Sequence, residues 1–469
     1  MNTTSAKIPL LLPVENQVRE LDAKILLACV AARQGFSTII GPRRRVEFHI
    51  TSFPRSIYIS KGLKSGNGSY FNILRKLGHV IVAWDEEALV HLPEDTYFSR
   101  RFSEKALKHV SRLLAWGQDN SELWLQFPKL PTGLPIDITG NPRGDLLRPD
   151  ISIFYDKEVS ELKKTYGKFI LVNTNFNQVN AFYPMQNLFQ PVKRPGERPR
   201  PGNLSEGMTR AFAKGLWNHK QLIFNDFKRL IPQLEQTLPG YAIVVRPHPG
   251  ENQEIYYRIE ADCQRVRVTN KGNVVPWLMA AAAVLHNGCT TGVEAYLLGV
   301  PSISYRATVN EEYDYAFHRL PNLMSHECFN SEQLRETLQK ILAGKLGVPQ
   351  GNGRRQIIDR HLSSRKGKLA CQRIVDVLNE VAEGMLESPK PSLSSRLKGL
   401  YMINRRRLRK KYRSLKPKSH NKPELAHHNY PGISMEELHS RISRFQEVLG
   451  YKRKLRVEGI GRQIYRIRP

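Results

Sequence analysis

The chain has 469 residues, which is too long for one ordinary hydrophobic core and suits two domains and an appendage. Its 40% hydrophobic and 25% charged residues are typical of a globular protein, and its apolar runs fall short of the roughly 20 residues of a membrane span. The five cysteines are scattered and form no CxxC pair, so we expect reduced thiols in a cytoplasmic protein and no zinc site.

The formal net charge of +29 is unevenly distributed along the chain. Residues 388–469 hold 22 Lys and Arg against five Asp and Glu. The basic excess therefore belongs mainly to the C-terminal part rather than to the chain as a whole.

The first 150 residues alternate short apolar runs with helical stretches. VRELDAKILLACVAARQG (18–35) has helical spacing and ends at a glycine. Strands are predicted at IPLLLPV (8–14) and in the runs FSTIIG, SIYISKG, HVIVAWD, SRLLAWG and IDITGN. This alternation predicts a parallel sheet covered by helices on both faces, in a first domain of residues 1–150.

Several polar residues of this domain follow predicted strands. VAWDEEAL (82–89) places Asp85 and Glu86 directly after an apolar strand, where a carboxylate could act as general base for an acceptor hydroxyl. An acidic helix N-terminus would explain the same residues. Other candidates for a ligand cleft, which could equally be structural, are Glu15 and Arg19 after the first strand, and Arg143 and Asp145 in ITGNPRGDLLRP.

A second α/β series is predicted over residues 151–387. It contains the strand KFILVNTNF (168–176), a helix over 210–236 and the strand YAIVVRPHP, followed by VLHNG and VPSISY with a helix between them. Asn173 and Asn175 follow its first strand and could contact a nucleotide or an acceptor.

The motif RPHPG (246–250) places a cation and an imidazole after a strand. Arg246 can offer a fork of donors to a phosphate, and His248 can donate to a phosphate oxygen or protonate a leaving group. A loop with a structural histidine is the alternative.

HNGCTTGVEAYLLG (286–299) predicts a strand end, a turn and a helix start. Gly288 allows the tight turn, and Thr290 or Thr291 would cap a helix whose N-terminus could bind phosphate. Glu294 would face the same crevice and accept from ribose hydroxyls, although an ordinary capped helix explains the pattern too. The motif RPHPG and this motif follow strands that look successive.

The sequence has neither a P-loop nor a GxGxxG motif, and no acidic pair in a metal-binding setting, so nothing favours a kinase, a dehydrogenase or a metal site.

Residues 388–423 contain 13 Lys and Arg and no acidic residue. With leucines and a tyrosine among the charges, 396–413 could form an amphipathic helix at an anionic membrane surface. Nucleic-acid binding and a solvated linker are the alternatives, and we consider nucleic acid the weaker partner. In the extension 424–469, a helix is predicted at MEELHSRISRFQEVL and a hairpin at LRVEGIGRQIYRI.

Three segments carry a resemblance to known proteins: GNPRGDLL (140–147), RPHP (246–249) and HNGCTTGVEAYLLGVPSISY (286–305). Together they resemble bacterial surface carbohydrate biosynthesis proteins, which are similar to capsule polysaccharide transferases and CDP-glycerol glycerophosphotransferases. The resemblance implies an α/β, GT-B-like fold of two Rossmann-like doubly wound domains facing a cleft, with an acceptor side in 1–150, a donor side in 151–387 and a basic C-terminal extension.

The resemblance also implies a function. His248 and the Thr290–Thr291 pair are similar to residues that hold the donor phosphate in bacterial GT-B sialyltransferases and Kdo transferases, Glu294 would contact the nucleoside, and Asp85 partly matches an acidic base motif in which Ala88 replaces a glycine. The implied activity is metal- and cofactor-independent transfer of a sugar or polyol phosphate from a nucleotide sugar or CDP-linked donor to a polysaccharide or lipid-linked acceptor, in the cytoplasm or at the inner membrane face. A non-hydrolysing sugar-nucleotide epimerase, or a nucleic-acid or scaffold protein that binds through its basic tail, are the alternatives.

Overall fold

The computed structural model of the chain describes residues 7–90, 93–192, 194, 196–314, 316–351, 353–415 and 423–469. The chain divides into two compact units. Unit 1 comprises the described residues of 1–89, 97–154 and 356–469, and unit 2 comprises those of 90–96 and 155–355.

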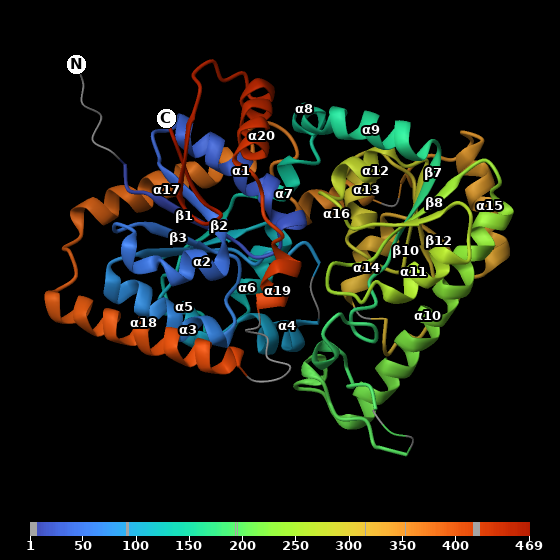
Figure 1. The fold of residues 1–469 in the computed structure, drawn as a ribbon, viewed down its shortest axis with the longest axis horizontal. Coiled ribbons are helices and arrows are strands. Elements are labelled where there is room, and N and C mark those ends of the chain that lie inside the picture. Colours follow the sequence, from blue (N-terminus) through green and yellow to red (C-terminus); the bar gives the residue numbers. More distant parts are fainter. Residues whose placement is uncertain are drawn as a thin grey trace. The chain divides into compact units, whose positions relative to one another are not determined.

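Unit 1 is built on an eight-stranded sheet (Figure 1). Six strands are parallel, and all five residues of the first are buried, as expected for a parallel sheet covered on both faces. In spatial order the strands are β13 (Arg456–Gly461), β14 (Ile464–Arg468), β2 (Thr38–Pro42), β1 (Leu10–Val14), β3 (Ile57–Ser60), β4 (Val80–Ala83), β5 (Arg112–Ala115) and β6 (Ile136–Ile138).

The helices of unit 1 come from both ends of the chain, and α4 and α16 begin in residues assigned to unit 2. They are α1 (Gln17–Arg33), α2 (Arg43–Phe48), α3 (Ser65–Leu77), α4 (Glu94–Arg101), α5 (Glu104–Leu107), α6 (Gln118–Leu125), α7 (Pro142–Asp145), α8 (Pro149–Ser152), α16 (Arg354–His361), α17 (Ala370–Glu387), α18 (Leu393–Ser414), α19 (Pro423–Asn429) and α20 (Met435–Val448), with short 3-10 turns at Ile50–Ser52 and Ile153–Tyr155. No helix among the described residues is long and apolar enough to cross a membrane.

The C-terminal part of the chain differs from the predicted arrangement of two domains in series, because residues from 356 onward return to unit 1. Helix α1 is buried along most of its length, and α17 and α20 pack against it. The predicted hairpin forms as β13 and β14 and joins the sheet by antiparallel pairing with β2. Residues that were predicted to belong to a second domain or an appendage therefore cover the apolar surface of α1 and pair with the open edge of the sheet. Of the predicted basic segment 388–423, residues 416–422 lie outside the described residues.

Unit 2 contains a six-stranded, fully parallel sheet. In spatial order its strands are β12 (His326–Cys328), β11 (Ser302–Tyr305), β10 (Ala283–His286), β7 (Phe169–Asn173), β8 (Ala242–Arg246) and β9 (Val266–Val268). Its helices are α9 (Asp156–Tyr166), α10 (Arg210–Thr237), α11 (Glu254–Ala261), α12 (Val275–Ala280), α13 (Thr291–Leu297), α14 (Ala316–Leu323) and α15 (Ser331–Leu342), with 3-10 turns at Pro184–Gln186 and Asn203–Ser205.

Alternate residues of the unit 2 strands enter two separate cores. Ile170, Val172 and Val245 pack on the side of α10, α11 and α15, while Phe169 and Val244 pack on the side of α9, α12 and α13. The strands β8 and β10, which the sequence suggested were successive, are not neighbours, because β7 lies between them.

Candidate functional site

The strand order of unit 2 marks one position on its sheet as special. From β7 the chain proceeds to β8 and β9 on one side, and β10, β11 and β12 follow on the other. In such sheets the carboxyl ends of the strands on either side of the reversal are the usual ligand site. The register places Asn173 at the end of β7 opposite both Arg246 and His286, so the predicted motifs meet at this edge.

Buried polar atoms without a hydrogen-bond partner occur in both units, and some of them lie at or just after the ends of β7 and β10, beside this reversal point. Among the described residues they include Asn173 Nδ2, Asn287 Oδ1 and Thr291 Oγ1. The other end of the Asn287 amide donates to the carbonyl of Asn175 at 3.4 Å and so connects the segments after β7 and β10. Buried polar groups in folded proteins are normally paired, so this group of atoms points to a polar ligand.

His248 is held in one tautomer by its neighbours. Its ring Nδ1 accepts the backbone N–H of Gly250 at 3.0 Å, so the neutral ring carries its proton on Nε2. Its own backbone N–H donates to the carbonyl of Thr174 and to the Glu251 carboxylate. The loop after β8 is thereby tied to the end of β7, and His248 has a proton to donate from Nε2.

The carboxylate that fixes this loop, Glu251, was not predicted from the sequence. It is fully buried and accepts hydrogen bonds from Thr174 Oγ1 at 2.9 Å and from the Tyr256 hydroxyl at 2.6 Å. Burial raises its pKa, while these hydrogen bonds and the one from the backbone N–H of His248 oppose the rise. The only sequence signal for Glu251 is its place three residues after His248. Because its carboxylate fixes the His248 loop by hydrogen bonds, we assign Glu251 a positioning role.

Arg246 differs from the predicted phosphate ligand. Its guanidinium donates to the carbonyls of Lys271 and Gly272 at 2.9 and 3.0 Å and lies over the ring of Trp277. Burial lowers its pKa to about 9. Because side chains alternate along a strand, Arg246 shares its face with Val244, which faces α12 and Trp277. Arg246 therefore holds the loop before α12, and we do not include it among the proposed donor contacts.

The turn after β10 is organised by two buried histidines. His286 Nδ1 accepts the backbone N–H of Gly288 at 3.0 Å, and its Nε2 donates to Ser325 Oγ at 2.8 Å. Burial lowers the pKa of His286 to about 3, so the ring is neutral near pH 7. Gly288 has a φ of +77°, in agreement with the predicted tight turn, and a Cβ there would lie 2.4 Å from the His318 ring.

His318 connects this turn to a buried lysine. Its Nδ1 donates to the carbonyl of Gly288 at 3.0 Å, and its Nε2 accepts from Lys220 Nζ at 3.0 Å. Burial lowers the pKa of His318 to about 3 and that of Lys220 to about 8. A polar pocket at the ends of β10 and β11 is lined in part by Lys220, Asn287, Arg306, Thr308, Asp314 and Asn322. Of these residues only Asn287 belongs to a motif that was recognisable in the sequence, because the others come from distant helices and strands.

The remaining predicted donor residues lie at the start of α13. Thr290 occupies the N-cap position, but its side chain makes no capping hydrogen bond, and the helix has only seven residues. Glu294 is buried one turn into the helix. The local structure thus agrees with the predicted strand, turn and helix, while the roles of Thr290, Thr291 and Glu294 remain predictions.

In unit 1 the carboxyl edge of the sheet carries a network of ion pairs. Glu20, only 1% exposed, accepts from Lys24 Nζ at 2.7 Å and from Lys61 Nζ at 2.6 Å, and its oxygens also accept the backbone N–H groups of Glu15 and Asn16. Burial opposes its ionisation, but the two lysines outweigh this effect and lower its pKa. The predicted cleft residue Glu15 pairs with Lys61 and with Arg43, each at 3.1 Å.

The acidic run after β4 is engaged by several partners. Arg19 forms a two-pronged pair with Glu87 at 2.9 and 3.0 Å, which brings the ends of β1 and β4 together. Asp85 is 2% exposed, accepts from the Tyr97 hydroxyl at 2.9 Å and lies 3.6 Å from Arg101. Glu86 accepts from the Trp84 indole at 2.7 Å. The two candidate bases are thus buried and hydrogen-bonded at the expected sheet edge.

The other two cleft candidates have structural contacts. Arg143 donates to the carbonyl of Glu86 at 3.2 Å and lies over the Trp116 ring. Asp145 is fully buried and accepts the backbone N–H groups of Ala370 and Cys371, both at 2.8 Å. Asp145 thereby caps α17, a role that the sequence could not indicate because the partners lie more than 200 residues away.

The sequence matches no protein-family model and has no significant match to a curated protein. A solved structure of the wall teichoic acid polymerase TagF, a variant soaked with CDPG, is similar over 82% of this chain and 90% of that chain, with 11% identity and a TM-score of 0.51. A UDP-GlcNAc 2-epimerase from Methanocaldococcus jannaschii, in complex with UDP-GlcNAc and UDP, covers 80% of this chain and 100% of that chain with 12% identity, but its TM-score of 0.46 supports no conclusion. The chain thus has a GT-B-like fold with two Rossmann-type sheets, as the sequence predicted.

Proposed function

We propose that this protein transfers a group from a nucleotide-activated donor to an acceptor hydroxyl, and that unit 2 binds the donor. The observation that carries the proposal is the group of unpaired buried polar atoms on Asn173, Asn287 and Thr291, at the point where the strand order of a Rossmann-type sheet reverses. The fold that the chain shares with TagF, a polymerase studied with CDPG, gives further support.

The chemistry of this edge suits a nucleotide diphosphate. Amide and hydroxyl groups can hydrogen-bond a base, a ribose or a phosphate, and the predicted contacts of Thr290, Thr291 and Glu294 belong to the same edge. The adjoining pocket is lined by Lys220 and Arg306, and also by Asp314, whose carboxylate pairs with Arg306 at 3.4 Å and partly neutralises their charge. His248, with its proton on Nε2, would donate to the donor phosphate and stabilise the charge that grows on the leaving nucleotide.

Unit 1 is proposed to receive the acceptor. In this proposal Asp85 or Glu86 accepts the proton of an acceptor hydroxyl, whose oxygen forms the new bond while the bond from the transferred group to the nucleotide phosphate breaks. The transferred group is a sugar or a polyol phosphate, and the acceptor is a polysaccharide or a lipid-linked chain. The donor is a substrate, so the proposed reaction requires no resident cofactor.

A thermal-shift screen with CMP-, CDP-, UDP- and GDP-linked donors tests the donor site. We expect one nucleotide class to raise the melting temperature, because a ligand that binds only the native state stabilises it. Asn173→Ala and His248→Ala should each weaken that shift. His326→Ala is a matched control, because His326 lies on β12 and its ring bonds to the carbonyl of Gly347. The proposal fails if no donor shifts the wild type, or if both site variants respond as the wild type does.

Transfer is distinguished from epimerisation by leaving out the acceptor. A transferase should leave a sugar nucleotide essentially unchanged when incubated with it alone, and should release the nucleotide when an acceptor polysaccharide is added. Conversion to an epimeric sugar nucleotide without acceptor would contradict the proposal and support the epimerase alternative.

A further inference from the structure

Helix α18 packs on unit 1 with one face, along α3 (Figure 1). Ile403 is buried, and Gly399 lies so close to α3 that a Cβ there would be 3.1 Å from the Leu77 side chain. This face therefore fixes the helix against the unit as a stable surface element.

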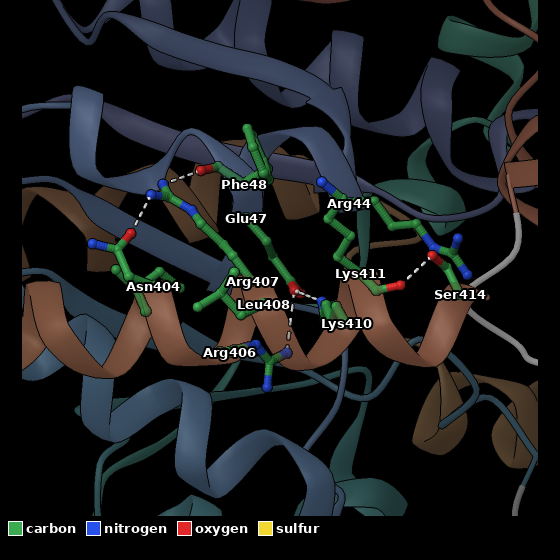
Figure 2. Close-up of a pocket in the computed structure, with 11 residues that line it drawn as sticks. Arg44, Glu47, Phe48, Asn404, Arg406, Arg407, Leu408, Lys410, Lys411 and Ser414 are labelled. Atoms are coloured by element: carbon green, nitrogen blue, oxygen red, sulfur yellow. Dashed lines mark hydrogen bonds and ion pairs between the residues drawn. The ribbon is translucent and has the colours of Figure 1, made fainter. Parts of the chain in front are cut away.

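A buried carboxylate on α2 strengthens this attachment. Glu47 accepts from Lys410 at 3.0 Å and from Arg406 at 3.3 Å on α18, and from Arg43 at 2.8 Å on its own helix. Figure 2 shows Glu47 directed at α18, with Arg406 and Lys410 on either side of its carboxylate. Arg407 adds a hydrogen bond to Thr51 at 3.1 Å. Part of the basic charge of α18 is thus used to hold the helix in place.

The outer face of α18 carries a stripe of exposed apolar side chains, which the polar residues Asn404 and Arg405 interrupt between Tyr401 and Leu408. The side chains that form it recur at three- and four-residue spacing, which places them on one side of the helix, and they are 39% to 73% exposed. They are Leu393, Leu397, Leu400, Tyr401, Leu408 and Tyr412. An exposed apolar row of this length is unusual on a water-soluble surface and indicates a partner.

Exposed positive charges border the stripe. Lys398, Arg405 and Arg409 lie along one edge by helical spacing, and the 22 residues of α18 include no acidic side chain. Beside the stripe, a groove of about 600 Å³ between α2 and α18 is lined by Arg44, Phe48 and Lys411 among others (Figure 2). An apolar row between cations matches the headgroup region of an anionic bilayer, where leucines enter the acyl boundary and Lys and Arg meet lipid phosphates.

We propose that the outer face of α18 docks the protein on an anionic lipid bilayer, with the apolar stripe inserted in the interface and the flanking Lys and Arg on lipid phosphates. The inference is independent of the proposed reaction, because it rests on the exposure, spacing and charge of α18 alone. A nucleic-acid partner would use the charges, and its bases would stack on the tyrosines, but it would leave the exposed leucines without a role.

Flotation of the full chain with two vesicle types tests the proposal. We expect binding to vesicles that contain about a third phosphatidylglycerol in phosphatidylcholine, and little binding to phosphatidylcholine alone. The combined variant Leu397→Gln, Tyr401→Gln, Leu408→Gln should bind about tenfold more weakly. Leu125→Gln on α6 is the matched control, because that leucine is 64% exposed but lies outside α18.

A measurement on the unaltered chain guards against a variant that fails to fold. Hydrogen exchange should show new protection in α18 when the phosphatidylglycerol vesicles are added, with none in α10. Equal binding to both vesicle types, full binding of the triple variant, or no new protection of α18 would each overturn the proposal. So would salt-sensitive binding to single-stranded RNA that survives the triple variant, with no vesicle binding.

Discussion

The carboxyl ends of the parallel strands in the two units differ in how their polar groups are paired. In unit 1 the edge is charged, and its charges neutralise one another: Glu20 with Lys24 and Lys61, and Arg19 with Glu87. In unit 2 the edge also carries charged side chains such as Arg246, but its turn after β10 is built on His286 and His318, which are uncharged near pH 7, and buried atoms of Asn173, Asn287 and Thr291 are unpaired.

This difference separates groups that stabilise the fold from groups that can serve a ligand. Removing one partner of a buried ion pair leaves an uncompensated buried charge, which lowers the stability of the fold. Each charged group of the unit 1 network therefore compensates the charge of its partners. A buried neutral polar group without a partner already costs about 1–3 kcal/mol, which a ligand can recover by hydrogen bonding. Four predictions test the comparison, in order of decreasing expected effect.

The largest effect is expected from Glu20→Gln in unit 1. The substitution leaves Lys24 without a carboxylate partner and Lys61 with only the more exposed Glu15, and it should lower the free energy of unfolding by about 3–5 kcal/mol. Chemical denaturation measures the loss. Glu104→Gln, which removes an exposed pair with Lys108 at 3.9 Å, is the control and should change stability by less than about 1 kcal/mol. Equal effects of the two variants would show that the edge of unit 1 is not held by its ion network.

Acidification should weaken unit 2 through its buried histidines. The pKa of His286 and of His318 is about 3 in the folded protein and near 6.5 when unfolded, so the unfolded chain binds more protons and stability is lost as pH falls from 6.5 towards 3. Each histidine should contribute a loss of about 1.4 kcal/mol per pH unit below about pH 6. Chemical denaturation is carried out at pH 7.5 and pH 5, and pulse proteolysis reports the unfolding of unit 2. The difference between the two pH values gives the slope of the free energy of unfolding against pH.

The variant His286→Asn cannot take up this proton and should flatten the slope. His326→Asn, which changes a histidine on the edge strand β12, should leave it unchanged. An identical slope in all three proteins would mean that His286 does not titrate on unfolding in this way.

Asn173→Ala tests whether the unpaired atoms of unit 2 serve a ligand. Because Asn173 Nδ2 has no hydrogen-bond partner among the described residues, we expect stability without ligand to change by less than about 1 kcal/mol. The donor found in the nucleotide screen should bind about tenfold more weakly, which corresponds to about 1.4 kcal/mol. Thr174→Val is the contrasting neighbour, because it removes a hydrogen bond to Glu251 and should lower stability even without donor. Unchanged donor affinity in Asn173→Ala would contradict a donor role for this edge.

The smallest effect is expected at the rim of unit 1. Arg19 and Glu87 are 22% and 27% exposed, so solvent screens their attraction and a double-mutant cycle with Arg19→Met and Glu87→Gln should give a coupling of about 0.5–1 kcal/mol. The coupling should fall in high salt. If the coupling free energy is as large as the stability lost in Glu20→Gln, solvent exposure does not determine how strongly the ion pairs of this network contribute to stability.

The local pattern of the sequence predicted most of the elements. The apolar runs of the first 150 residues became β1 to β6, the segment after Leu455 became the hairpin β13–β14, and 396–413 lies within α18. Gly288 adopts the turn that its position after a strand required. These features depend on residues a few positions apart, so hydrophobic period and turn chemistry are sufficient to predict them.

The partners of the polar residues were not predictable in the same way. Arg246 follows a strand, as a phosphate ligand would, yet its alternation with Val244 directs it to the loop before α12. Asp145 looked like a cleft residue and instead caps α17. Glu251, Lys220 and His318 belong to no recognisable motif. Their roles depend on contacts with residues distant in the sequence, such as the hydrogen bond between Lys220 and His318.

The sequence alone thus determined the α/β alternation, the polar clusters that follow the strands and the amphipathic nature of α18, because each is written in the spacing of neighbouring residues. Only the tertiary structure decided that β7 separates β8 from β10, that residues beyond 356 return to unit 1, and which charges neutralise each other. Strand order and ion pairing are set by contacts between residues far apart in the chain, such as Glu47 with Lys410, and no local periodicity encodes them.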